Sequence, residues 1–239
     1  ERITAIPELL QDRPETGVII LDDALQHRRV KAGCNILLTD FSNLFTRDFF
    51  LPAGNLRDQR SSYERADMIV VTKCPPDLTK EAREKILKEI RILPYQAIFF
   101  TTIQYGVPYH LFNRNERQFS QKDKLLVVCG IARPAPFIHF LKQQAKSYEL
   151  VAFPNHHAFT ATDVNHIRKK YDRIHGEQKL IVTTEKDAVR LLPFTKELVD
   201  IPVFVLPVQH RFLFDGGMQF DNIVTTFIET FTREKNNYE

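Results

Sequence analysis

The chain has 239 residues, of which 43% are hydrophobic and 26% are charged, so it can bury a substantial core in one large domain or two modest ones. Its net charge of +3 is too small to indicate nucleic-acid binding without a clustered basic patch, although it would suit an anionic membrane surface. The sequence has no signal peptide and no apolar run long enough to cross a bilayer, which predicts that these residues span no membrane.

The first two elements are predicted from hydrophobic spacing. Residues 1–10 carry apolar side chains at helical spacing, which predicts an initial helix. Residues 18–21 are an unbroken aliphatic run, typical of a strand buried on both faces of a parallel sheet. The run ends in Asp22 and Asp23, where open α/β sheets bind ligands, and paired carboxylates there indicate a hard cation. The alternative is that the two acids only cap a helix.

Residues 34–103 alternate between strands and helices or irregular crossovers. Strands are predicted at residues 34–39, 67–72 and 97–103, with a short helix at 61–66 and an amphipathic helix at 78–93. The long segment 41–58 lacks a regular period but is rich in Phe and Leu, which predicts an ordered, functional loop. This alternation is typical of an α/β domain with a mainly parallel sheet.

A second βα series follows residues 105–120, which are predicted to form a linker, in part a β-hairpin. Its predicted strands and helices are, in order, 125–132, 136–148, 150–153, 161–171, 180–184, 187–198 and 203–207. Residues 219–233 have apolar side chains at helical spacing and predict a helix that docks on another part of the chain. The predicted domains are therefore a nucleotide-binding core (1–104), the linker (105–120), a second smaller α/β domain (121–208) and a C-terminal segment (209–239) packing back on the core.

Three cysteines lie far apart in the sequence, each beside an apolar run. Their spacing matches neither a zinc site nor a redox motif, and it is typical of reduced, buried thiols.

Two adjacent histidines follow a predicted strand of the second series. His156 and His157 stand in the loop position where α/β units place functional groups. Imidazole is the side chain best tuned to proton transfer near neutral pH, so one of the two can serve a cleft. The alternative is a loop that only caps the helix beginning near Thr160 or Thr162.

Two cations lie at the start of a later helix. Lys186 and Arg190 are four residues apart, so both can face the same way. They can contact a nucleotide or an acidic lipid, or they can pair with Glu185 and Asp187, which is the slightly favoured interpretation.

Five segments resemble signature motifs of the tetraacyldisaccharide 4'-kinase family, the kinase of lipid A synthesis. They are, in order, DDALQH at 22–27, LPAGNLRD at 51–58, GIARPAPF at 130–137, FPNHHAFT at 153–160 and TTEKDAVR at 183–190. The chain departs from the usual motif residues at Ala24, Leu25, Asn55, Asp58 and Asn155. An Asn before the first histidine can still orient an imidazole, but it stabilises the charged form less well than the usual Asp.

The resemblance implies an α/β fold with a P-loop-kinase-like, mainly parallel sheet, incomplete at the N-terminus, plus a second, smaller α/β unit. It implies a lipid kinase that transfers the γ-phosphate of ATP to the 4'-hydroxyl of a tetraacylated glucosamine disaccharide 1-phosphate, giving lipid IVA. The implied cofactors are ATP and Mg²⁺, and the implied partners are the acylated disaccharide lipid and the inner-membrane surface, with no nucleic acid. The implied location is peripheral, on the cytoplasmic face of the inner membrane of a Gram-negative bacterium.

The resemblance also implies roles for individual side chains. The candidate metal ligands are Asp22, Asp23 and Asp58. The candidate phosphate or substrate ligands are Gln26, Arg57 and Lys186. The candidate catalytic residues are Asp23, His27 and His156, with His156 acting on the acceptor hydroxyl together with an aspartate.

The phosphate-binding loop of such kinases has no counterpart here, because no GxxxxGK[ST] motif occurs in the sequence. We expect that loop, the partner aspartate and an apolar anchor upstream of Glu1. The 239 residues are therefore expected to lack 4'-kinase activity, whereas a version extended at the N-terminus should have it.

Three other functions use the same features. A different P-loop kinase or GTPase-like protein would share the Asp-tipped strand but act on a soluble substrate. A non-catalytic nucleotide-fold module would keep the fold for protein contacts alone. A metal-dependent hydrolase built on the two acids and His27 is less favoured, since no second cluster of His and Asp has the needed spacing.

Overall fold

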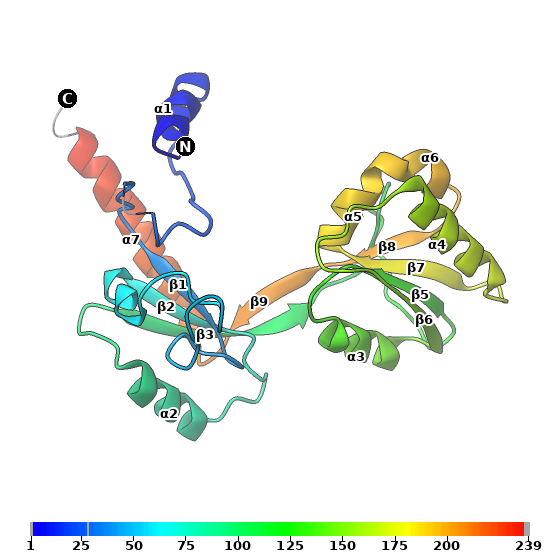
Figure 1. Ribbon diagram of the computed structural model, residues 1–239, viewed down its shortest axis with the longest axis horizontal. Helices are drawn as coiled ribbons and strands as arrows, with labels where there is room; N and C mark the ends of the chain where they lie inside the picture. The colour runs from blue at the N-terminus through cyan, green and yellow to red at the C-terminus, as the bar shows by residue number, and fades with distance from the viewer. Residues whose placement is uncertain (1, 28, 237–239) are drawn as a thin grey trace. The chain divides into compact units, whose positions relative to one another are not determined.

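The computed structural model describes residues 2–27 and 29–236 of the chain (Figure 1). The chain divides into two compact units: unit 1 comprises Glu1–Ile103 and His210–Glu239, and unit 2 comprises Gln104–Gln209. Each unit is built around its own sheet, with strand order β1-β2-β3-β9 in one and β4-β8-β7-β5-β6 in the other. None of the helices in the described residues combines the length and apolar character needed to span a membrane.

Unit 1 contains a sheet whose first three strands are parallel. Its strands are β1 (Ile36–Asp40), β2 (Met68–Thr72), β3 (Ala97–Tyr105) and β9 (Val208–Phe212). Its helices are α1 (Arg2–Asp12), the 3-10 helix η1 (Arg60–Arg65), α2 (Lys80–Ile90) and α7 (Gly216–Asn236). The predicted initial helix and the three predicted strands between residues 34 and 103 are confirmed, whereas β9 was not predicted.

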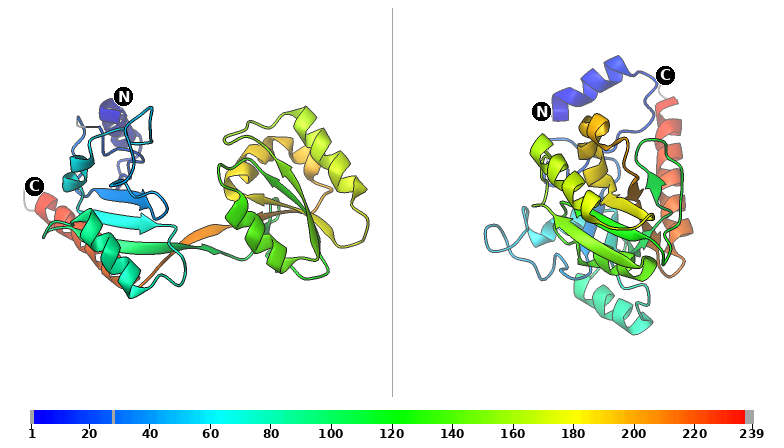
Figure 2. Two further views of the ribbon diagram at one scale, coloured as in Figure 1. Left: turned by 60° about the horizontal axis from the view of Figure 1, so that its bottom comes forward. Right: turned by 90° about the vertical axis from the view of Figure 1, so that its right-hand side faces the viewer.

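Two helices cover opposite faces of this sheet (Figures 1 and 2). Successive residues of a strand point to opposite faces, and β2 shows this clearly. Its Ile69 and Val71 pack in one cluster with Ile86 of α2. Its Met68 and Val70 pack in another, against Phe220 and its neighbours on α7. The final amphipathic helix therefore packs on unit 1 through the apolar face that its spacing predicts.

The predicted buried strand at residues 18–21 is wrong for this structure. These residues form no strand, and the side chain of Ile20 is 90% exposed. A strand forms where a neighbouring strand satisfies its backbone N–H and C=O groups, and residues 18–21 have no such neighbour among the described residues. The edge strand β1 likewise leaves Leu38 exposed.

Unit 2 has four parallel strands, with a short antiparallel one at the edge. The strands are β4 (Tyr109–His110), β5 (Lys124–Cys129), β6 (Ser147–Ala152), β7 (Lys179–Thr184) and β8 (Val203–Leu206). The helices are α3 (Ala135–Gln144), α4 (Ala161–Arg173), α5 (Glu185–Leu191), the 3-10 helix η2 (Leu192–Phe194) and α6 (Thr195–Leu198). The predicted single helix at 187–198 is three short helices, because Pro193 lacks the N–H that a continuous α-helix requires.

The side chains of β5, which lies between β7 and β6, pack in two apolar clusters. Leu126 and Val128 pack with Val164 of α4, whereas Leu125 and Val127 pack on the α3 side. Figure 1 shows α3 on one side of this sheet and α4 on the other. Because β5, β6 and β7 are parallel, the loops that follow them leave the sheet at the same edge.

All three cysteines are free thiols. The pKa values of Cys74 and Cys129 are raised to about 11, mainly by burial. These two thiols are therefore almost entirely protonated near neutral pH. Cys74 and Cys129 are structural side chains of the core, whereas Cys34 is only partly buried.

Candidate functional site

Two of the matched motifs lie side by side in unit 1. Arg57 donates from Nη1 to Oδ2 of Asp23 over 2.5 Å, which joins LPAGNLRD to DDALQH. Arg65 strengthens this junction, since its Nη2 lies 2.8 Å from Oδ2 of Asp58 and 2.9 Å from the carbonyl oxygen of Leu25. Arg57 and Asp58 are neighbours in the sequence, yet each pairs with a partner elsewhere in the chain.

The loop that carries Arg57 is tightly built around Asp48. The carboxylate of Asp48 accepts hydrogen bonds from the backbone N–H of Phe49 at 2.8 Å and of Asn55 at 3.2 Å. Leu56 N–H donates to the carbonyl of Phe49 over 3.0 Å and closes the loop. A Cβ at Gly54 would lie 2.3 Å from the Phe49 carbonyl oxygen, so only glycine fits there. This part of the loop predicted at 41–58 thus has a defined geometry.

The acids of unit 1 differ in their surroundings. The pKa of Asp58 is lowered to about 2, chiefly by the hydrogen bond from Arg65, so this carboxylate is ionised at neutral pH. Asp22 and Asp23 are exposed on the loop that follows residues 18–21, and Asp23 adopts a positive φ of 50°. No group of three His, Cys, Asp or Glu side chains in the described part of the chain is placed to hold a metal ion. The three predicted metal ligands are thus not preassembled as one cluster.

The two remaining residues of the first motif lie on the same loop. The side-chain amide of Gln26 donates to the carbonyl oxygen of Asp23 over 2.9 Å, which holds the loop closed. His27 is exposed. The observed contact of Gln26 is therefore with its own loop, and His27 lies at the surface.

In unit 2, a buried carboxylate joins two other matched motifs. Asp187 is fully buried and accepts hydrogen bonds from the N–H of Gly130 and the hydroxyl of Thr184, each at 2.8 Å. Nη1 of Arg190 lies 3.2 Å from the other carboxylate oxygen. Gly130 follows β5 and Thr184 ends β7, so Asp187 ties together two loops at one edge of the sheet. The ion pair between Arg190 and Asp187 confirms the favoured interpretation for Arg190, in which it pairs with an acid of its own motif.

The adjacent histidines have different environments. Nε2 of His157 lies 3.0 Å from Oδ2 of Asp163, and the ring stacks on Phe153 at 4.7 Å between centroids. His156 is exposed, and its Nδ1 lies 3.2 Å from Nη2 of Arg190. His157 therefore belongs to the loop that caps α4, as the alternative interpretation held, whereas His156 is the accessible histidine.

Sequence reasoning missed the partner of His157. Asp163 accepts from the N–H and hydroxyl of Thr160 at 2.8 and 2.7 Å, while Thr160 accepts from the N–H of Asp163. This capping box has a recognisable pattern, Thr-x-x-Asp, at the start of an amphipathic helix. That pattern would have marked Asp163 as the acid close to the histidine loop.

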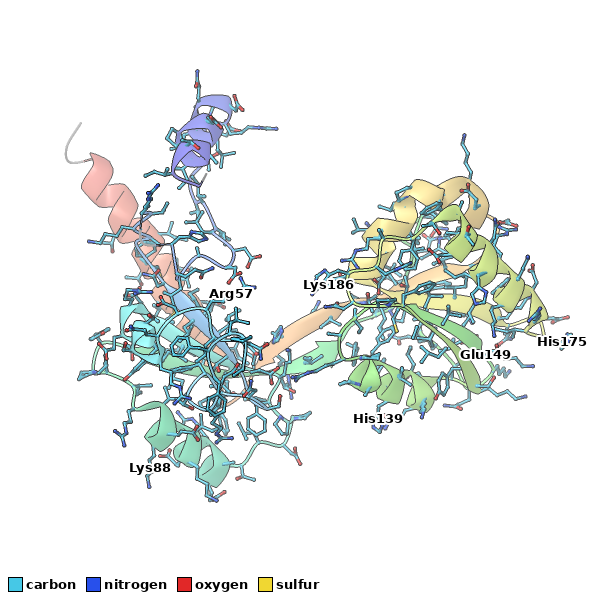
Figure 3. The ribbon with its side chains drawn as sticks, viewed as in Figure 1. Arg57, Lys88, His139, Glu149, His175 and Lys186 are labelled. Carbon is cyan, nitrogen blue, oxygen red and sulfur yellow. The ribbon has the colours of Figure 1, made fainter. Side chains whose placement is uncertain are left out.

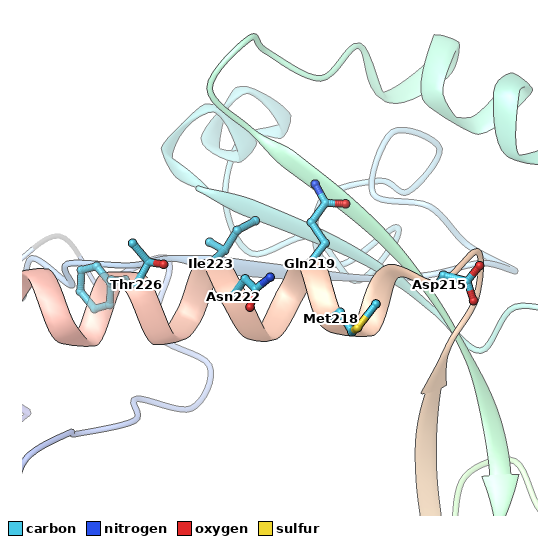
Figure 4. Close-up of a pocket in the computed structure, with 7 residues that line it drawn as sticks. Asp215, Met218, Gln219, Asn222, Ile223 and Thr226 are labelled. Atoms are coloured by element: carbon cyan, nitrogen blue, oxygen red, sulfur yellow. The ribbon is translucent and has the colours of Figure 1, made fainter.

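Lys186 and a hollow along α7 are not part of these contacts. Figure 3 labels Arg57 in unit 1 and Lys186 in unit 2, and Lys186 is exposed at the start of α5. A shallow hollow of about 700 Å³ runs along α7 (Figure 4). Its lining consists of Asp215, Met218, Gln219, Asn222, Ile223, Thr226 and Phe227. None of the predicted site residues lines this hollow.

Comparison with known sequences gives consistent matches. A family model described as tetraacyldisaccharide-1-P 4'-kinase matches residues 1–229 of the chain. The tetraacyldisaccharide 4'-kinase of Phocaeicola vulgatus is 40% identical over 229 residues, covering 93% of this chain and 63% of that protein. The tetraacyldisaccharide 4'-kinase of Flavobacterium johnsoniae is 39% identical over 232 residues, covering 95% of this chain and 64% of that protein. The chain thus spans less than two thirds of the length of these curated relatives.

The fold is also similar to that of a solved structure. It is an "apo" form of LpxK from Aquifex aeolicus in complex with ATP, with a TM-score of 0.60 and 21% sequence identity. The match covers 92% of this chain and 61% of the other. At this identity the likeness concerns the fold, and it confirms the prediction of an α/β, P-loop-kinase-like architecture.

Proposed function

Because this chain belongs to the tetraacyldisaccharide-1-P 4'-kinase family, we propose that it takes part in transfer of the γ-phosphate of ATP to the 4'-hydroxyl of a tetraacylated disaccharide 1-phosphate. In this reaction the bond from phosphorus to the β-γ bridging oxygen breaks, a bond to the 4'-oxygen forms, and the hydroxyl proton passes to a base. The observation that carries the proposal is the junction in unit 1, where Arg57 of one motif meets Asp23 of another.

The donor set of this junction suits Mg²⁺, although it contains no cluster of three acids. Mg²⁺ is usually held by one or two carboxylates, with phosphate oxygens and waters completing its shell. Asp22 and Asp23 would supply the carboxylates, and Asp58 would stay ionised nearby through its pair with Arg65. When bound, Mg²⁺ would neutralise charge on the β- and γ-phosphates.

The other side chains of the junction would position the phosphates. Arg57 is the cation beside Asp23, and a guanidinium can donate two parallel hydrogen bonds to phosphate oxygens. Gln26 holds the Asp23 loop through its bond to the loop carbonyl, and His27 is exposed on the same loop. Catalysis of this kind rests on such positioning more than on covalent chemistry.

Unit 2 would supply groups for the acceptor. His156 is exposed on the loop after β6, so we assign it to the acceptor hydroxyl. Lys186 is an exposed cation at the start of α5 and would attract the phosphate of the acidic lipid.

Unit 1 also offers a surface for the lipid partner. Phe49, Phe50 and Leu51 are consecutive, and they are 63%, 49% and 61% exposed. The bonds around Asp48 hold them at the tip of an ordered loop, and the guanidinium of Arg60 stands 5.9 Å from the Phe49 ring centroid. Aromatic side chains next to arginine are typical of membrane-interface contacts. This loop would contact acyl chains at the cytoplasmic face of an inner membrane.

A kinase assay on matched variants tests the function. The chain would be extended at the N-terminus to the length of its relatives and incubated with ATP and the acylated disaccharide, and the lipid product would be extracted. We expect Asp23→Ala and His156→Ala each to lower kcat by about 100-fold or more, since each removes a positioned group. Asp77→Ala and His175→Ala replace exposed side chains elsewhere and should leave kcat unchanged.

Three results would contradict the proposal or the expectation that a phosphate loop lies upstream. Phosphate transfer only to a soluble acceptor would favour a different P-loop kinase. Full activity of Asp23→Ala would mean that the junction is only a structural contact. Equal turnover by the 239-residue chain and the extended version would show that no further phosphate loop is needed.

A further inference from the structure

Three side chains in unit 2 form a line from the core to the surface. Asp187 is fully buried, Arg190 is half-buried, and His156 is exposed. Nη1 of Arg190 contacts the Asp187 carboxylate at 3.2 Å, and its Nη2 lies 3.2 Å from Nδ1 of His156. One guanidinium thus bridges a fixed carboxylate and an accessible imidazole.

The inner end of this line cannot easily move. Asp187 also accepts hydrogen bonds from the N–H of Gly130 and from the hydroxyl of Thr184, both at 2.8 Å. A Cβ at Gly130 would lie 3.1 Å from the carbonyl oxygen of Pro154 and 3.3 Å from Oδ1 of Asp187, so the loops are closely packed. The carboxylate therefore fixes the direction in which the Arg190 side chain points.

The backbone fixes the outer end as well. His156 has a positive φ of 61°, which is uncommon for a residue other than glycine. Its N–H lies 3.3 Å from the carbonyl oxygen of Gly130, on the loop that also binds Asp187. The imidazole is thus held beside the guanidinium by the same pair of loops.

The contact between the two side chains decides where the imidazole carries its proton. A guanidinium has only donors, so Nδ1 of His156 must accept in this contact. A neutral imidazole that accepts at Nδ1 carries its hydrogen at Nε2. We propose that Arg190 is a positioning residue that fixes His156 as the neutral tautomer protonated at Nε2.

This assignment deepens the proposed function and rests on it for its catalytic meaning. An imidazole protonated at Nε2 presents an N–H donor to the oxygen of the acceptor or of the transferred phosphoryl group. In that state Nε2 does not accept the hydroxyl proton, so the base of the reaction is another group. His157 differs, because its Nε2 faces the Asp163 carboxylate and the ring belongs to the helix cap.

Nuclear magnetic resonance of the ¹⁵N-labelled 239-residue chain tests the tautomer without any assay of activity. At a pH at which the ¹⁵N chemical shifts show a neutral imidazole, we expect a coupling across the hydrogen bond between Nη2 of Arg190 and Nδ1 of His156. The ratio of Nε2-protonated to Nδ1-protonated forms should be about ten-fold higher for His156 than for the exposed His175, as expected for one charge-assisted hydrogen bond.

The variant Arg190→Met removes the donors while keeping an unbranched side chain. We expect the coupling to vanish and the His156 tautomer ratio to fall to that of His175, with the His157 signals unchanged. If the variant does not fold, the wild-type spectrum decides alone. A wild-type His156 with no coupling and the tautomer ratio of His175 would overturn the proposal.

The result of the nuclear magnetic resonance experiment can be distinguished from the result of the kinase assay. A fixed His156 tautomer together with an extended protein that phosphorylates no lipid would refute the proposed function and leave the role of Arg190 standing. In an active extended protein, Arg190→Met should lower kcat by about ten-fold with little change in KM, because it alters the imidazole and not the substrate contacts.

Discussion

Asp163 connects the histidine loop to the helix that follows it. Its carboxylate accepts from the N–H and hydroxyl of Thr160 and faces Nε2 of His157 at 3.0 Å. These hydrogen bonds lower the pKa of Asp163 to about 2, and the bond from the Thr160 hydroxyl has the largest effect. The charge of one side chain therefore stabilises both the start of α4 and the orientation of an imidazole.

This lowered pKa predicts a pH dependence of stability. Because the pKa of Asp163 is lower in the folded chain than its ordinary value of about 4, its contribution is complete above about pH 4 and is lost as the pH falls towards 2. Asp163→Asn cannot titrate. The difference in urea midpoint between wild type and variant should therefore be largest near neutral pH and shrink steadily between about pH 4 and 2.

Asp40 and Asp58 titrate in the same range but are present in both proteins, so the difference isolates Asp163. A difference in midpoint that stays constant from pH 7 to 2 would show that the carboxylate charge contributes nothing.

At the scale of the element, α7 shows how an amphipathic helix docks on unit 1. Phe220 lies edge-on to Phe99 of β3, with centroids 5.4 Å apart, and 4.9 Å from the ring of Phe212 in β9. Aromatic pairs of this kind add to the stabilisation from apolar burial. The contact ties the C-terminal helix to two strands that lie far from each other in the sequence.

Removal of this anchor should destabilise unit 1. Because Phe220 is half-buried, we expect Phe220→Ala to lower the free energy of unfolding by about 2 kcal/mol, less than the cost at a fully buried site. Met218 on the same helix is 76% exposed, so Met218→Ala should change stability by less than about 0.5 kcal/mol. Urea unfolding of both variants measures the effect, and equal stability of the two would contradict this account of how α7 docks.

Among the helices and strands, apolar spacing in the sequence predicts some elements and fails for others. The spacing of apolar residues predicts α2, α4 and α7, because one face of each helix is buried against a sheet. The same reasoning fails at residues 18–21, where an aliphatic run has no neighbouring strand among the described residues, and at β9, whose residues are mostly exposed. A strand depends on a partner distant in sequence, whereas a helix satisfies its own backbone.

At the scale of the whole molecule, the apolar loop of Phe49, Phe50 and Leu51 predicts association with lipid. The chain contains no tryptophan, so Phe50→Trp introduces a single tryptophan whose emission can be followed by itself. We expect its emission to shift to shorter wavelength with anionic phospholipid vesicles, and brominated lipids to quench it, because the indole would enter the interface.

Val199→Trp is the matched control, because Val199 is 61% exposed on unit 2. Its emission should not change with vesicles. Adding Phe49→Ser and Leu51→Ser to Phe50→Trp should weaken vesicle partitioning by about ten-fold for each apolar side chain removed. Equal quenching of Phe50→Trp and Val199→Trp would rule out a specific lipid contact by the loop.

The sequence by itself determined the α/β class, the family motifs and most of the elements, because apolar periodicity and turn residues act over a few neighbouring positions. Only the tertiary structure decided which side chains of those motifs meet. Arg57 and Asp23 are 34 residues apart, and Gly130 and Asp187 are 57 apart. Gly130 and Asp187 meet because the parallel strands β5 and β7 bring their following loops to one edge of the sheet, whereas Arg57 and Asp23 meet through two loops of unit 1. The contacts of the folded chain also distinguish His157, in a helix cap, from His156, beside Arg190.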